Sequence, residues 1–263
     1  AVDALNAIPL PLFGIIALGV TFLAPRRKVS PRWVSGVLLL TAATLATYAA
    51  ANLLVLAIAW AVSAVPFLTG RFFSIPGEHE IPRLSRAIVL GSIGCLAVGV
   101  ALLVVTGDGT GALQLYGQTA VRHGSGGLLT PAFSLLIAAV FLRKGLLPVH
   151  SWIVAAFERG PLLPLALLVN GHLGVFLAAR VALPLLPDVG REALPMLGDA
   201  ALLTAAYAAI LALVERQPRR LLALLYVSQA SFLLLGLESS NPDGIAGTLV
   251  HWQVIAVATT TMA

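Results

Sequence analysis

Apolar stretches of about 18–25 residues recur along the whole chain, and this repetition constrains the fold more than any other feature. Hydrophobic residues make up 59% of the 263 residues and charged residues only 10%, too few to cover a soluble domain of this size. A helix of about 20 apolar residues crosses a bilayer, and a helix satisfies its own backbone hydrogen bonds in lipid. We therefore predict an all-α, polytopic transmembrane helix bundle.

The hydrophobic pattern predicts about nine spans, with Gly, Pro and Ser marking the connections between them. We treat residues 1–263 as a single transmembrane domain. Because the final segment ends within an apolar run, and the chain begins without an initiator Met, we expect it to be part of a longer protein. The predicted spans are 9–24, 33–50, 52–69, 87–106, 127–149, 161–183, 195–214, 219–237 and 245–263.

The basic residues are distributed unequally between the two sets of loops. If the spans alternate in direction, eleven of the sixteen Lys and Arg residues lie in one set and three in the other. The positive-inside rule places the richer set in the cytoplasm, and it explains the net charge of +5 without a nucleic-acid partner. We expect a multi-pass protein of the inner or plasma membrane. The cytoplasmic loops then include Arg26, Arg27, Lys28, Arg219 and Arg220.

The remaining two cations, Arg143 and Lys144, fall inside a predicted span, shortly before Pro148. An ionisable residue at the centre of a span costs about 2.5–3.5 kcal/mol on insertion scales. Proline removes a backbone donor and clashes with the carbonyl four residues earlier, which belongs to Lys144. We therefore predict a helix break at these cations, and broken helices build ion paths in transporters. The alternative is that both cations lie near a helix end and extend to the membrane interface.

Three further polar residues are candidates for a proton path. His172 lies near the middle of its span, and histidine titrates near neutral pH. His251 and Gln229 lie in two later apolar runs. The alternatives are a neutral histidine hydrogen-bonded to a neighbouring helix, a glutamine that joins two helices, and Trp252 as an interfacial anchor.

Other chemistries find little support in the sequence. Neither a phosphate-binding G-x-x-x-x-G-K-[ST] loop nor an H-E-x-x-H or G-x-S-x-G motif occurs, and the acidic residues lie mostly in loops. The single cysteine, Cys95, excludes internal disulfides and cysteine-based metal or redox centres. We expect no cofactor and no metal on this chain.

Several segments resemble the antiporter-like membrane subunits of respiratory complex I, a family that includes membrane-bound hydrogenase and Mrp-type cation/proton antiporter subunits. Residues 142–180, LRKGLLPVHSWIVAAFERGPLLPLALLVNGHLGVFLAAR, resemble the pattern K-x-x-x-x-P-x-H-x-W-L-P and the helix that follows it. Residues 219–236 resemble D-L-K-R-L-L-A-Y-S-S-I-S-H-M-G, and residues 51–68 resemble D-N-L-L-L-L-x-x-G-W-E. The positions that match the motifs are Trp60, His150, Trp152, Pro161, Arg180 and Arg220.

The resemblance implies a fold like helices three to eleven of a fourteen-helix subunit with inverted repeats. Residues 33–183 would form the first five-helix repeat and residues 195–263 the start of the second, with a discontinuous helix near 143–148. The chain departs from the family at five positions: Ala61 replaces a glutamate, Arg143 and His172 replace lysines, and Ile255 and Thr259 replace polar groups of the last span.

The resemblance also implies a proton-translocating membrane subunit of a complex I-like NADH:quinone oxidoreductase or a related cation/proton antiporter complex. Its path would use Arg143, Lys144, His172, His251 and Gln229. Its partners would be other membrane subunits, the lipid bilayer and protons or Na⁺, with flavin, iron–sulfur and quinone sites on other subunits. Two alternatives stay open: a non-conducting structural subunit, and the membrane subunit of an energy-coupled inorganic-carbon uptake complex.

Overall fold

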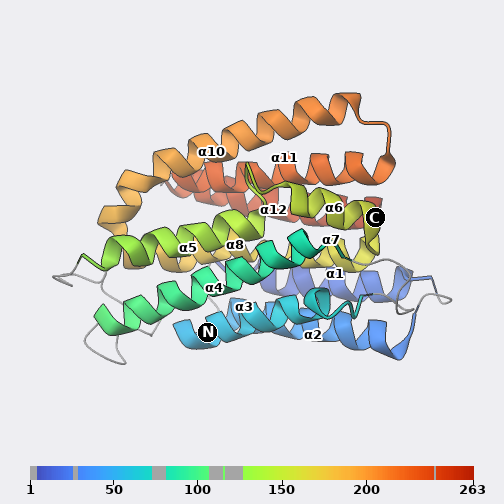
Figure 1. Cartoon of the computed structure of the whole chain (residues 1–263), viewed down its shortest axis with the longest axis horizontal. Helices are drawn as coiled ribbons and strands as arrows, with labels where there is room; N and C mark the ends of the chain where they lie inside the picture. Colours follow the sequence, from blue (N-terminus) through green and yellow to red (C-terminus); the bar gives the residue numbers. More distant parts are fainter. Residues whose placement is uncertain (1–4, 26–28, 73–80, 107–114, 116–126, 240) are drawn as a thin grey trace.

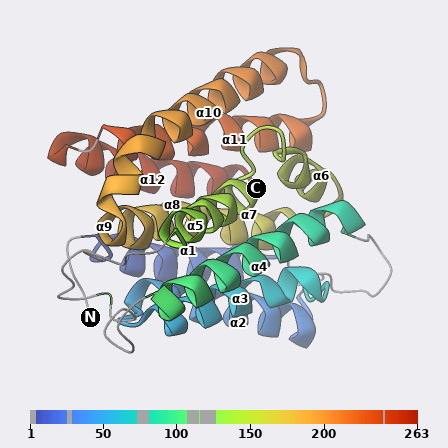
Figure 2. The same ribbon diagram turned by 60° about the vertical axis from the view of Figure 1, so that its left-hand side comes forward.

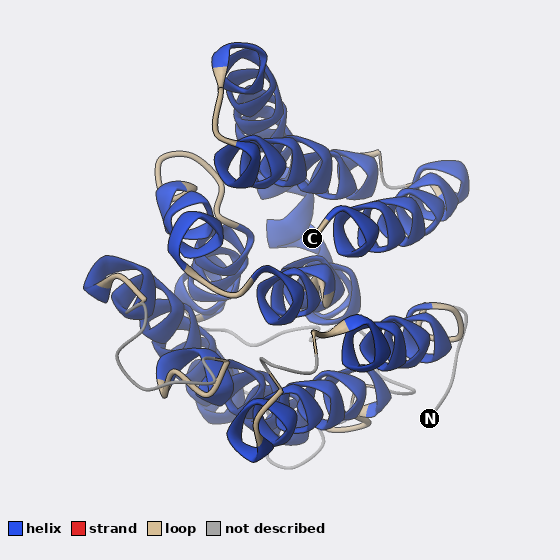
Figure 3. Cartoon of the chain, turned by 90° about the vertical axis from the view of Figure 1, so that its right-hand side faces the viewer, coloured by secondary structure: helices blue, strands red, loops and turns tan. Residues whose placement is uncertain are grey.

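The computed structural model describes residues 5–25, 29–72, 81–106, 115, 127–239 and 241–263. Within these ranges the regular structure is helical and contains no strand, which confirms the predicted all-α class (Figure 3). The helices run roughly along one direction, so Figure 3 shows most of them nearly end-on.

The first part of the chain forms four helices, α1 (Pro9–Leu23), α2 (Pro31–Ala49), α3 (Leu53–Leu68) and α4 (Arg83–Thr106). Consecutive helices of this group pack against each other (Figure 1). Their starts follow local chemistry, since the Ser30 hydroxyl accepts a hydrogen bond from the Trp33 N–H and the Asn52 side chain accepts one from the Leu54 N–H. Helix α2 also has a proline in its first turn, where a missing N–H breaks no intrahelical bond.

The second part begins with α5 (Leu129–Lys144), α6 (Ser151–Arg159), α7 (Leu162–Asn170) and α8 (Leu173–Leu177). A π-helical turn, η3 (Ala178–Ala182), and α9 (Leu183–Leu185) continue α8. Three longer helices follow, α10 (Pro187–Val214), α11 (Pro218–Glu238) and α12 (Pro242–Met262). Helix α10 packs along α11 at one side of the bundle, as Figures 1 and 2 show.

The centre of the bundle is the segment from α7 to η3. In the most apolar stretch of residues 162–182, 83% of the residues are buried, against 33% in α4 and 33% in α12. Helices α1, α5 and α12 all pack against this segment. The outward surface is apolar as well, with Phe22, Val105 and Leu213 at least 75% exposed, which suits a lipid environment.

The helices follow the predicted spans in order, although not every one is long enough to cross a membrane unaided. Among the described residues, five helical segments have the length and apolarity for this: 83–106, 162–182, 189–214, 218–238 and 243–262. Helices α1 and α3 are shorter apolar helices. The bundle therefore has the helices of a multi-pass membrane protein.

The predicted helix break is present, and the structure adds a second one. Helix α5 ends at Lys144, where Gly145 adopts a left-handed conformation with φ of 65° and its N–H bonds the Phe141 carbonyl. Residues 145–150 then lead into α6. The span 161–183 is also interrupted, because His172 has a φ of 39° between α7 and α8. A positive φ is uncommon for a residue other than glycine, although histidine tolerates it better than branched residues.

Candidate functional site

The two helix breaks bring Lys144 and His172 into contact. The Lys144 Nζ lies 2.8 Å from the His172 Nδ1. Both residues are buried, with exposed fractions of 4% and 1%. An amine and an imidazole at this distance share one hydrogen bond, in which either group can hold the proton. The structure thus joins the end of α5 to the turn between α7 and α8 through two titratable groups.

Aromatic side chains enclose this pair. The Tyr226 ring of α11 stacks on the His172 ring, with centroids 5.8 Å apart and an interplanar angle of 16°. Its hydroxyl donates to the Val169 carbonyl at 2.7 Å and lies 3.5 Å from the His172 Nδ1. The Trp252 ring of α12 meets His172 edge-on at 5.3 Å, so this tryptophan is a buried packing residue and not an interfacial anchor.

The close approach of α5 and α8 depends on a residue without a side chain. A Cβ atom on Gly174 would lie 2.8 Å from the Lys144 Cγ and 3.4 Å from the Val140 carbonyl oxygen. In the same turn, the Tyr48 hydroxyl of α2 donates to the Gly171 carbonyl. The position of His172 therefore depends on packing against α5 and on a hydrogen bond from α2.

Arg143 points to a different part of the bundle from Lys144. Its Nη2 donates to the Ser63 hydroxyl of α3 at 2.9 Å, and its Cζ lies 5.5 Å from the centroid of the Trp60 ring. Arg143 is 7% exposed and Trp60 is fully buried. The two adjacent cations of the predicted path thus have separate surroundings, and Lys144 is the one that meets His172.

Residues on α6 and α10 hold the broken segment between α5 and α6 in place. The Trp152 indole N–H donates to the Leu142 carbonyl at 2.8 Å. The Thr204 hydroxyl of α10 accepts a hydrogen bond from the Leu147 N–H at 3.0 Å. The His150 ring packs edge-on against Tyr207, with centroids 5.2 Å apart.

The other predicted path residues do not join the Lys144–His172 contact. The His251 Nε2 lies 3.1 Å from the backbone carbonyl of Gln229, which links α12 to α11. The Gln229 side chain itself is exposed. Ile255 and Thr259 are buried one and two turns farther along α12.

The remaining motif positions have structural surroundings. Pro161 is the residue that precedes α7, and Arg180 is half-buried in η3. The Nε of Arg220 lies 3.2 Å from a carboxylate oxygen of Glu215. Helix α3 presents Ala61 half-buried beside Trp60.

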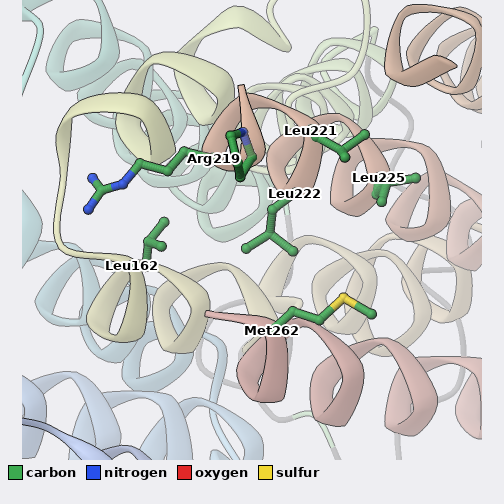
Figure 4. Close-up of a pocket in the computed structure, with 7 residues that line it drawn as sticks. Leu162, Arg219, Leu221, Leu222, Leu225 and Met262 are labelled. Atoms are coloured by element: carbon green, nitrogen blue, oxygen red, sulfur yellow. The ribbon is translucent and has the colours of Figure 1, made fainter. Parts of the chain in front are cut away.

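A surface groove lies apart from these groups, between the ends of α7, α11 and α12 (Figure 4). Its volume is about 220 Å³, and six of its seven lining residues are apolar. The exception is Arg219, which donates to the Glu158 and Gly160 carbonyls at 3.4 and 3.0 Å. Within the described ranges, groups of three or more His, Cys, Asp or Glu residues that could hold a metal ion do not occur.

Three residues of the site had no signal in the sequence that we recognised. Tyr226, Ser63 and Gly174 are common residue types within apolar runs, and only the tertiary structure brings them to the two cations. The second break did have a signal, because Asn170 and Gly171 form an N-G pair, which is typical of turns.

Comparison with known proteins identifies relatives of this chain. Residues 50–262 match the family described as NADH:quinone oxidoreductase/Mrp antiporter, TM. Subunit N of the NADH-quinone oxidoreductase of Beutenbergia cavernae is 28% identical over 224 residues, which cover 80% of this chain and 41% of that protein. Subunit 2 of the chloroplastic NAD(P)H-quinone oxidoreductase of Chlorokybus atmophyticus is 27% identical over 70% of this chain and 37% of that protein. The chain thus spans less than half the length of these relatives.

Solved structures share the fold. A chain of the Mrp complex from a Dietzia species superposes with a TM-score of 0.80 and 21% identity, over 96% of this chain and 29% of that chain. A chain of respiratory complex I from Thermus thermophilus superposes with a TM-score of 0.78 and 22% identity, over 99% of this chain and 56% of that chain.

Proposed function

Because this chain belongs to the NADH:quinone oxidoreductase/Mrp antiporter family of membrane subunits, we propose that it translocates protons within a complex I-like oxidoreductase or a related cation/proton antiporter complex. The observation that supports this most directly is the buried contact between the Lys144 Nζ and the His172 Nδ1 at 2.8 Å. Two titratable groups in the interior of an apolar bundle are expensive to keep unless they act.

The contact suits the transfer of a proton with little movement. When Lys144 is an ammonium group, it donates to the neutral imidazole; when it is an amine, the imidazole N–H donates to it. The proton moves from one nitrogen to the other while the two nitrogen atoms stay at hydrogen-bond distance. The His172 Nε2 is buried and, among the described residues, has no hydrogen-bond partner, so it offers a second face for a proton to arrive or leave.

The test is the removal of the titratable group at residue 172 without disturbing its backbone. His172→Asn suits this purpose, because asparagine tolerates a positive φ and does not titrate between pH 4 and 10, whereas leucine would strain the turn. Gln253→Leu is the control, since the Gln253 side chain bonds back to the Leu249 carbonyl of its own helix. The assay is proton uptake by proteoliposomes that contain the full-length protein in its complex.

We expect His172→Asn to assemble normally and to lose proton uptake, while Gln253→Leu retains it. Normal uptake by an assembled His172→Asn complex would show that the relay is absent. That result would favour the alternative function, a non-conducting structural subunit, which the buried apolar side chain of Ile255 also supports. The proteins that co-purify separate the remaining cases: redox and quinone-module subunits indicate an oxidoreductase, and a zinc protein indicates carbon uptake.

We also propose that the membrane is the inner or plasma membrane, with the Arg219 loop in the cytoplasm. The positive-inside rule supports this orientation. Arg219 contacts the carbonyls of Glu158 and Gly160, so the connection between α6 and α7 and the connection between α10 and α11 lie at the same end of the bundle. The sidedness can be tested with an Arg216→Cys variant, whose new cysteine precedes α11, and a thiol reagent that does not cross the membrane. Reaction only after the membrane has been permeabilised supports the cytoplasmic placement, and reaction in intact cells contradicts it.

A further inference from the structure

Arg143 occupies a buried pocket in which the unused polar atoms are all donors. Its guanidinium carries five N–H donors, and the Ser63 hydroxyl accepts a hydrogen bond from Nη2 at 2.9 Å. Nη1 is buried and has no hydrogen-bond partner among the described residues. The indole N–H of Trp60, whose ring lies 5.5 Å from the guanidinium carbon, is buried and unpartnered in the same sense. The Ser63 hydroxyl is committed as a donor to the Trp60 carbonyl at 2.6 Å.

Among the residues that the structure describes, no negative charge compensates the Arg143 guanidinium. Helices α3 and α5, which supply its residues, contain neither aspartate nor glutamate. In the described part of the chain, no carboxylate forms an ion pair with Arg143. The next residue, Lys144, adds a second cation, and its partner His172 brings no negative charge. A buried charge is tolerated when it is paired, so this pocket calls for an anion.

We propose that Arg143 and Trp60 form a binding site for a small monovalent inorganic anion such as chloride, while Ser63 holds the Arg143 Nη2 and does not contact the anion. The anion accepts hydrogen bonds from the Arg143 Nη1 and the Trp60 Nε1 and neutralises the guanidinium. A water molecule would satisfy the same donors but would leave the charge in place. Ser63 and Trp60 are fully buried and Arg143 is 7% exposed, so a carboxylate side chain of another subunit would have to enter the bundle, whereas a small ion needs only a transient gap. This site goes beyond proton translocation and does not depend on it.

Bromide replaces chloride in such sites and can be located by its anomalous scattering. Crystals of the full-length protein in its complex, grown in chloride and transferred to bromide, should show an anomalous peak in contact with the Arg143 Nη1 and the Trp60 Nε1. A map with only a water at this position, or with no peak, would overturn the proposal.

A matched pair of variants tests the site in solution. Ser63→Asp places a carboxylate where the hydroxyl now accepts from Arg143, so it supplies a counter-charge from the chain itself. Ser63→Asn has nearly the same size and no charge. In this experiment chloride replaces gluconate while the ionic strength is held constant. Each tenfold rise in the chloride concentration above the dissociation constant should raise the unfolding temperature of the wild-type protein and of Ser63→Asn by a constant step.

Ser63→Asp should unfold at the same temperature in chloride and in gluconate. The proposal is contradicted if the unfolding temperature of the wild-type protein does not change with the chloride concentration. It is also contradicted if the chloride effect persists in Ser63→Asp. Should Ser63→Asp fail to assemble, the bromide map of the wild-type protein and the chloride titration decide the question without it.

Discussion

Replacing Gly174 with alanine should separate Lys144 from His172 by a steric clash alone. The added Cβ would lie 2.8 Å from the Lys144 Cγ, 3.3 Å from its Cδ and 3.4 Å from the Val140 carbonyl oxygen. Carbon atoms in contact normally lie about 3.5–4.0 Å apart. The stem of Lys144 must therefore move by roughly 0.7 Å or more, or α8 must move away from α5.

The energetic consequence follows from this displacement. Overpacking of a filled interior costs typically about 1–3 kcal/mol, because neighbouring side chains leave their preferred rotamers. The Lys144–His172 hydrogen bond, at 2.8 Å, has little length to spare, because beyond about 3.5 Å it no longer counts as one. We expect a lower free energy of unfolding by about 1–3 kcal/mol and a loss of most proton uptake.

The matched control is Gly94→Ala, which makes the same chemical change in another helix. A Cβ on Gly94 meets nothing within 4 Å, so this variant should be as stable as the wild-type protein or more stable, since alanine favours helices over glycine by about 1 kcal/mol. Thermal unfolding and proton uptake by the reconstituted full-length complex measure both effects. Equal stability and equal uptake in the two variants would refute the reasoning, because Lys144 would then not be held by the contact between α5 and α8.

Three further predictions concern the surroundings of the site. Tyr226→Phe removes a buried hydroxyl that donates to a backbone carbonyl of α7, and chemical denaturation should show a loss of about 1 kcal/mol with the aromatic stack intact. Thr204→Val leaves the Leu147 N–H without its acceptor, so hydrogen exchange at this amide should accelerate while that within α10 stays unchanged. The backbone N–H of Gln217 donates to the Glu215 carboxylate and is the main reason that the pKa of Glu215 lies below its ordinary value. The ionised carboxylate therefore stabilises the folded protein fully above the ordinary pKa, and this contribution disappears as the pH falls through the lowered pKa. The stability difference between the wild-type protein and Glu215→Gln should vanish over the same pH range, as acid titration of thermal unfolding can show.

The helices and the first break could be predicted because their causes are local. Each apolar run is visible in the sequence, and Pro148 determines where the long span must be interrupted. The positive φ at His172 has a local signal in Asn170 and Gly171, which does not by itself distinguish a turn from a continuous buried helix.

The composition of the site could not be predicted, because its contacts join distant segments. Ser63 and Arg143 are 80 residues apart in sequence, and Lys144 and His172 are 28 apart. The sequence places both cations at one point of one helix. Only the directions of their side chains show that one faces α3 and the other faces the turn before α8.

The opposite directions of Arg143 and Lys144 have a consequence for comparisons between relatives. Neighbouring residues on a helix differ by about 100° in direction, so one residue gained within α5 would give Arg143 the direction that Lys144 now has, and one residue lost would give Lys144 the direction that Arg143 now has. After the gain, His172 would face a group that stays charged, and after the loss, Ser63 would face a group that titrates. An alignment that differs by a single column therefore decides whether a relative is taken to carry a proton acceptor at this depth. Relatives should be compared by the helix each cation faces, α3 or α8, before their alignment columns are trusted.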